Sequence, residues 1–173
     1  PADFFNAPID PAAPTAVEAE ELVFDSARNE ITARGDVVLR ISGYILAGQR
    51  LVYRRAAGEM QLIGNVTVTD PAGNVSKSDL LNLTGGLKRV VLDSMTLTAH
   101  DGSRITADSA EFDQVLNSIL VNAQYAPCGD CIGPSGQRIG WSISAARIVQ
   151  HADDNSITLE QPSLALLGMP VAW

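Results

Sequence analysis

The sequence predicts an all-β fold, a stack of short antiparallel strands, and three observations lead to this prediction. From residue 19 onward apolar and polar residues alternate, which is the period-two pattern of half-buried strands. The same alternation returns at an offset of 29 residues, so that Leu22 corresponds to Leu51 and Leu80. Turn-forming sequences such as Asp70-Pro71-Ala72-Gly73 separate the alternating segments.

The 29-residue repeat predicts how the strands are assembled. It continues in register through much of the chain, pairing Phe24 with Tyr53, Ile31 with Met60, Ala33 with Leu62, Gly35 with Gly64, Val37 with Val66 and Met95, Leu39 with Val68 and Leu97, Gly73 with Gly102, and Asp79 with Asp108. Each unit supplies about two strands and cannot bury its apolar face alone, so the units must stack. The residues leave a solenoid, a sandwich and a jelly roll as alternatives, each with an open strand edge at both ends.

Proline content separates the N-terminus from the repeats. Residues 1–18 hold four prolines and show neither helical nor strand periodicity, so we expect a flexible N-terminal arm there. Residues 19–173 are expected to form one β domain, interrupted by an irregular stretch over residues 127–140. The apolar ending, Leu164 to Trp173, suggests that the chain continues into a further part of a longer protein.

Charge and composition exclude several classes of function. A net charge of −8 and a pI near 4.6 argue against a nucleic-acid partner and against anionic membrane surfaces. The most apolar run is far shorter than the ~20 residues that a transmembrane helix needs. Hydrophobic residues make up 46% of the chain and aromatic residues only 5%, so any interior is lined mainly by small aliphatic side chains.

Two cysteines, Cys128 and Cys131, form a CxxC pattern. A redox role needs a helix N-terminus beside a βαβ unit, and a zinc site needs two more ligands that His100 and His151 are not spaced to supply. We therefore expect the cysteines to anchor a loop, paired with each other or with cysteines outside this chain. No phosphate loop, Ser-His-Asp pattern or zinc-protease motif is present, so the sequence predicts no enzyme activity, no metal and no cofactor.

Three segments resemble the OstA-like domains of the lipopolysaccharide transport system. They run from Asn29 to Val37, from Met60 to Val66 and from Ile105 to Phe112, and the first two carry that family's A-x-G-N/D-V signature in part or in full. The resemblance extends from about residue 19 to the C-terminus. It implies a V-shaped β-jelly roll, or β-taco, whose trough carries lipopolysaccharide through the periplasm.

Within that superfamily, two features resemble the N-terminal periplasmic domain of the LptD family of outer-membrane assembly proteins. They are the segment from Tyr125 to Cys131 followed by Trp141, and the ending from Gly168 to Trp173, which is similar to the strand that leads into the membrane barrel. The resemblance implies an LptA-like partner at the N-terminal edge and an LptE-like lipoprotein bound to the absent barrel. It also implies a disulfide from Cys128 to the barrel, while Cys131 has no counterpart.

The expected function is to carry the acyl chains of lipid A through the trough to the outer-membrane barrel. Alternatives are an LptA-like periplasmic bridge, a structural β-solenoid without lipid cargo, and a polysaccharide hydrolase with a convergent acidic pair. Leu22 and Phe24 are expected on the partner edge. The alternation predicts these lipid-facing residues: Ile31, Ala33, Val37, Leu39, Leu51, Tyr53, Met60, Leu62, Val66, Val68, Leu83, Val90, Leu92, Leu97, Phe112, Ile119 and Val121.

Overall fold

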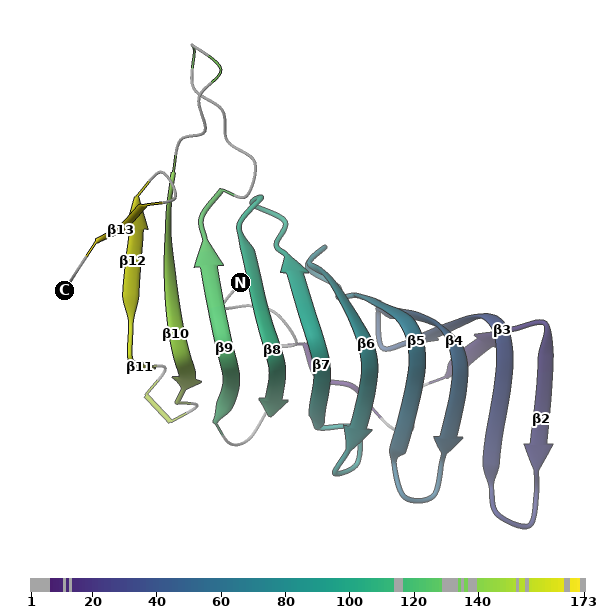
Figure 1. The fold of residues 1–173 in the computed structure, drawn as a ribbon. Helices are drawn as coiled ribbons and strands as arrows, with labels where there is room; N and C mark the ends of the chain where they lie inside the picture. The colour runs from purple at the N-terminus through teal and green to yellow at the C-terminus, as the bar shows by residue number, and fades with distance from the viewer. Residues whose placement is uncertain are drawn as a thin grey trace.

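The computed structural model describes residues 7–10, 12, 14–113, 117–128, 134, 136, 140–151, 153–154, 156–166 and 169–171. All strands in these ranges belong to one sheet of thirteen strands (Figure 1). They are β1 (Thr15–Glu18), β2 (Glu21–Asp25), β3 (Glu30–Ile41), β4 (Tyr44–Arg54), β5 (Glu59–Thr69), β6 (Val75–Thr84), β7 (Arg89–Thr98), β8 (Arg104–Asp113), β9 (Ser118–Ala126), β10 (Trp141–Gln150), β11 (Ile157–Glu160), β12 (Ser163–Leu166) and β13 (Met169–Val171). The described ranges contain no helix with the length and apolar character that a membrane span needs.

The sheet is a sequential antiparallel meander. From β3 to β10 each strand pairs with the next one along the chain, and the sheet does not close on itself. At each end of the sheet, two short strands pair with the edge of one long strand. β1 and β2 pair with different halves of β3, and β11 and β12 pair with different halves of β10. The fold therefore has two open ends, as the sequence predicted.

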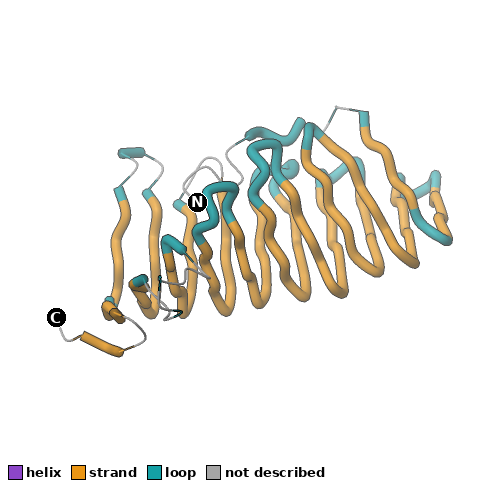
Figure 2. Tube along the Cα trace, turned by 90° about the horizontal axis from the view of Figure 1, so that it is seen from above, coloured by secondary structure: helices purple, strands orange, loops and turns teal. Residues whose placement is uncertain are grey.

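Each long strand bends near its middle, and this bend gives the sheet its shape. The register shifts between Arg34 and Val37 on β3 and between Ile63 and Val66 on β5. Gly35 and Gly64 occupy these bends with φ of 77° and 81°, a backbone conformation that glycine adopts without steric cost. The two halves of the strands consequently form two walls that face each other, as the view from above shows (Figure 2).

Cross-strand pairing arranges the inward side chains in three rows, which we call ladders. Residues directly opposite each other in paired strands lie on the same face of a sheet. Ladder 1, on the first wall, consists of Val17, Leu39, Leu46, Val68, Ser76, Leu97, Ile105, Tyr125, Ile143 and Leu164. On the second wall, ladder 2 consists of Leu22, Ala33, Leu51, Leu62, Leu81, Leu92, Ala110, Leu120, Ile148 and Leu159, and ladder 3 of Phe24, Ile31, Tyr53, Met60, Leu83, Val90 and Phe112.

The backbone confirms the 29-residue repeat and corrects one of its correspondences. Gly73 and Gly102, one period apart, occupy equivalent turns with φ of 92° and 87°. Leu22 and Leu51 share ladder 2, but the residue of β6 on that ladder is Leu81, 30 residues after Leu51, and not Leu80. In β6 the buried residues are Ser76 and Ser78 before the bend and Leu81 and Leu83 after it. Two residues instead of one separate Ser78 from Leu81, so the alternation shifts by one position.

Part of the predicted N-terminal arm is structured. Thr15–Glu18 form β1 directly after Pro14, the last proline of the N-terminal segment. These residues can pair with β3, which places Val17 on ladder 1. Ile9 is buried in the hydrophobic core, and the Tyr44 hydroxyl donates a hydrogen bond to the carbonyl oxygen of Ala7 at 2.6 Å. Burial, with a smaller contribution from the Asp70 carboxylate, raises the pKa of the Tyr44 hydroxyl well above its usual range.

Candidate functional site

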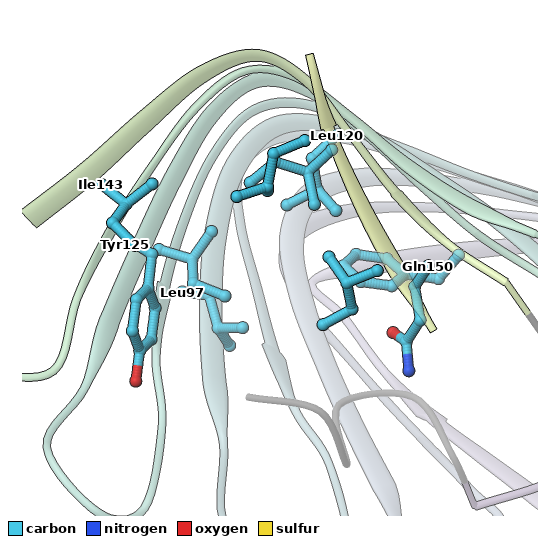
Figure 3. A pocket seen from close by; sticks show the side chains of 10 residues that line it. Leu97, Leu120, Tyr125, Ile143 and Gln150 are labelled. Carbon is cyan, nitrogen blue, oxygen red and sulfur yellow. The ribbon is translucent and has the colours of Figure 1, made fainter. Parts of the chain in front are cut away.

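An apolar cavity of about 360 Å³ lies between the two walls toward the C-terminal end of the sheet. Five strands, β7 to β11, supply its side chains, and Figure 3 shows Leu120 near the top of the arch formed by the strands. Tyr125 and Gln150 lie on opposite sides of the space below it. The lining consists of Leu97, Ile105, Phe112, Leu120, Tyr125, Ile143, Ile148, Gln150, Ile157 and Leu159.

Side-chain size explains why the cavity opens at this end. Over β3 to β7 the ladders carry mainly Leu, Val, Tyr and Met, and the core residues there are almost fully buried. From β8 onward, four inner positions that are buried carry alanine: Ala107, Ala123 and Ala145 along the bend and Ala110 on ladder 2, while the next members of ladder 2, Leu120 and Ile148, remain large. These short side chains cannot fill the space between the walls, so a void remains that larger residues would close.

The lining is chemically uniform. Apart from the Tyr125 hydroxyl and the Gln150 amide, every side chain that lines the cavity is a hydrocarbon, and none is charged. Tyr125 also contacts Trp141 edge to face, with ring centroids 6.1 Å apart and an interplanar angle of 66°. Such a surface binds hydrocarbon chains, since each methylene removed from water contributes about 0.8 kcal/mol.

Groups that could support other chemistry lie elsewhere. In the part of the chain that the structure describes, no three His, Cys, Asp or Glu residues are placed to share a metal ion. The backbone N–H of His100 donates to the Asn74 side-chain oxygen at 3.0 Å, and a ring nitrogen of His151 lies 2.9 Å from the Thr158 hydroxyl. Both histidines thus take part in local hydrogen bonding near strand ends.

Most of the predicted lipid-facing residues lie on the inner face, but few of them line the cavity. Leu97 and Phe112 do. Ile31 is partly buried and packs against the core. We call the packed part of the sheet, β3 to β7, the closed half. The predicted residues buried there are Ala33, Val37, Leu39, Leu51, Tyr53, Met60, Leu62, Val66, Val68, Leu83, Val90 and Leu92. Their contact with lipid stays a prediction.

The predicted inward orientation of Ile119 and Val121 is wrong. Val121 is 36% exposed, and Leu120 lines the cavity in its place. Ala123 is buried on the inner face, and simple alternation from it would turn Val121 and Ile119 inward as well. Asn122, however, has a φ of 49° and adds one residue at the bend, so the alternation changes phase between Ala123 and Leu120.

Sequence reasoning missed eight of the ten lining residues. Ile143, Ile148, Ile157 and Leu159 belong to β10 and β11, and Ile105, Leu120, Tyr125 and Gln150 belong to β8, β9 and β10. The alternation within β10 could have indicated an inner face for Ile143. It could not indicate that the walls separate here, because that depends on side chains from several strands.

The predicted partner edge is exposed. Leu22, Val23 and Phe24 of β2 are 49%, 53% and 52% exposed, and in the described ranges β2 pairs only with β3. At the other end, Cys128 lies within the described residues whereas Cys131 does not, and the pairing of the cysteines stays a prediction.

Together, the fold and the site define an open β-jelly roll with an apolar trough between its walls. The chain is similar in structure to LptH from Pseudomonas aeruginosa, described as the LptA-homologous periplasmic component of the conserved lipopolysaccharide transport device. The match has 21% sequence identity and a TM-score of 0.52, and it covers 62% of this chain and 80% of LptH. No protein-family model matches the sequence, and no curated protein matches it either. The likeness confirms the predicted β-jelly-roll fold.

Proposed function

We propose that this chain is a periplasmic, non-enzymatic component of lipopolysaccharide transport that holds the acyl chains of its cargo in the trough. The observation that carries the proposal is the cavity itself, with its uncharged, mainly hydrocarbon lining on the inner face of an open sheet. Apolar contact alone stabilises a bound acyl chain, so the net charge of −8 does not prevent the protein from carrying an anionic lipid.

Movement of cargo along the sheet requires a change in the closed half. The cavity ends at Leu97 on β7, and from there to β3 the ladders of the two walls are packed together with Ile9. A chain in the cavity therefore lies against β7 to β11. Its passage past β3 to β6 requires the walls to separate and Ile9 to leave its position.

Site-specific photo-crosslinking tests the proposal. A photoreactive amino acid at Leu120 or Ile148 should crosslink to bound lipopolysaccharide, because both side chains line the cavity. The same amino acid at Arg147, the exposed neighbour of Ile148 on β10, and at the outward-facing Thr67 serves as the matched control. Equal crosslinking from Arg147 or Thr67 would contradict a lipid site inside the trough.

The exposed edge at β2 is proposed to receive a strand from an LptA-like component. Its backbone groups are free to extend the sheet, as in β-strand addition. Successive N–H groups point to opposite edges of a strand, so one of the substitutions Leu22→Pro and Val23→Pro removes a donor that faces the partner. Unchanged binding of the partner by both variants would rule the edge out.

The finer assignment concerns the place of the chain in the transport system. One form is a periplasmic bridge of the LptA type. The other is an LptD-type domain that delivers lipid to an outer-membrane barrel with an LptE-like lipoprotein, which is the role that the resemblance of residues 125–131 and Trp141 implies. Fractionation of the full-length protein distinguishes the two, because a bridge is released with the periplasm and a barrel protein remains in the outer membrane.

A further inference from the structure

Two buried hydroxyl groups on β6 have no hydrogen-bond partner in the described structure. They belong to Ser76 and Ser78, which are 0% and 7% exposed. A hydroxyl that loses water on folding and gains no partner destabilises the folded state. Native proteins pair the large majority of such groups, so two orphans on one strand need an explanation.

Other buried polar side chains of the same region are paired. The Asp70 carboxylate accepts hydrogen bonds from the backbone and side-chain nitrogens of Asn74, both at 2.9 Å. The Ser103 hydroxyl donates to the Asp101 carboxylate at 2.6 Å. The fold therefore satisfies its polar groups at the turns beside β6, and the two serines are exceptions to that pattern.

Ser76 is the cross-strand neighbour of Leu97, at the end of the cavity that borders the closed half. It is a member of ladder 1, where it pairs with Val68 on β5 and with Leu97 on β7, and Leu97 lines the cavity. Every other member of ladder 1 is aliphatic or, at Tyr125, aromatic. A valine at position 76 would continue the row and leave no unpaired hydroxyl, so the apolar pattern of ladder 1 does not account for the serine.

Ser78 lies at the bend of β6, opposite Val66. It also borders a polar hollow of about 380 Å³, together with Thr67, Lys77 and Asp79. Its hydroxyl oxygen is nevertheless buried and unpaired. Of the two unpaired hydroxyls, that of Ser76 is therefore the one beside a residue that lines the cavity, and that of Ser78 is a second one on the same strand.

We propose that Ser76, assisted by Ser78, is a hydrogen-bonding subsite for the ester or amide that joins an acyl chain to its headgroup. When cargo moves from the cavity into the closed half, its polar linkage must pass ladder 1 while surrounded by hydrocarbon. A serine hydroxyl can donate to the carbonyl oxygen of either linkage and can accept from an amide N–H. The inference rests on the proposed function, because it requires a chain in the trough.

Two fluorescent amphiphiles with the same dye and the same chain length test the proposal. In one the chain is attached through an amide, and in the other through a methylene group. Wild-type protein should bind the amide-linked probe roughly 2- to 10-fold more tightly, which is the gain from one net hydrogen bond. Ser76→Ala should abolish that preference and Ser78→Ala should reduce it. Thr67→Ala, which removes an outward hydroxyl from the neighbouring strand, should leave the preference unchanged.

Unfolding of the empty protein separates a ligand subsite from a structural role. An orphaned hydroxyl gains no stabilising hydrogen bond on folding, so Ser76→Ala should leave the urea midpoint unchanged or raise it. A clear fall in the midpoint would mean that the hydroxyl is already paired, for example with a trapped water, and would overturn the proposal. Tight binding of both probes with no preference would overturn this inference alone. If neither probe bound the wild-type protein, the proposed function would fail with it.

Discussion

Ladder 2 provides a matched pair of leucines that tests the division of the trough into a closed and an open half. Leu81 is fully buried where the walls are packed, and Leu120 is 7% exposed and lines the cavity. Replacing either one by alanine removes the same hydrocarbon, with a loss in transfer free energy of about 2 kcal/mol. At Leu81 a new cavity adds to this loss, for a total of roughly 3–5 kcal/mol. At Leu120 the neighbouring space is already empty, so the loss should stay near 2 kcal/mol.

Urea unfolding of the two variants measures the difference. Both should unfold with the wild-type m-value, since the surface exposed on unfolding changes little, and Leu81→Ala should have the lower midpoint. A saturating fatty acid should then raise the free energy of unfolding of the wild-type protein by about 2.7 kcal/mol when its concentration is 100 times its Kd, and the urea midpoint should rise with it. Equal losses for the two variants, or a larger loss for Leu120→Ala, would refute the idea that the walls separate only toward the C-terminal end.

Two further predictions concern the N-terminal contact and the stacking of turns. Burial and then Asp70 raise the pKa of Tyr44, so the unfolded state releases this proton first and the protein loses stability as the pH rises above about 10. Tyr44→Phe, which also removes the hydrogen bond to Ala7, should cost about 1 kcal/mol at neutral pH and show a smaller alkaline loss when urea midpoints are compared. Gly58→Ala should lower the thermal midpoint more than Gly86→Ala. Both glycines have positive φ, 62° and 71°, but a Cβ at Gly58 would lie 2.7 Å from the Cα of Gly86, whereas at Gly86 it would meet open space. Equal effects would show that backbone strain alone determines the cost.

Some inner positions carry large side chains in the core and small ones beside the cavity. Along ladder 2, Leu81 and Leu92 precede Ala110, and along the bend Val66 and Met95 precede Ala107. The change from large to small residues occurs without any interruption of strand pairing.

The sequence predicted the strands of the first half well because local signals determine them. Alternation placed Leu39, Leu62 and Val68 on the inner face, and the repeat paired Gly35 with Gly64 at equivalent bends. These features depend on neighbours within a few residues, which a single sequence displays directly. The β1 strand was missed because its four residues follow a proline-rich segment, and its stability comes from pairing with β3, far along the chain.

By itself, the sequence determined the all-β fold class, the stacking of antiparallel strands with open ends and the apolar character of the inner face, since period-two patterns and turn residues are local properties of the chain. Only the tertiary structure decided which inner residues line a cavity and which are packed core. Extra residues at the bends, such as Asn122, reverse the alternation over half a strand and cannot be recognised from hydrophobicity alone. The unpaired hydroxyl of Ser76 likewise emerged only from the structure, because whether a serine has a partner depends on the residues that surround it in space.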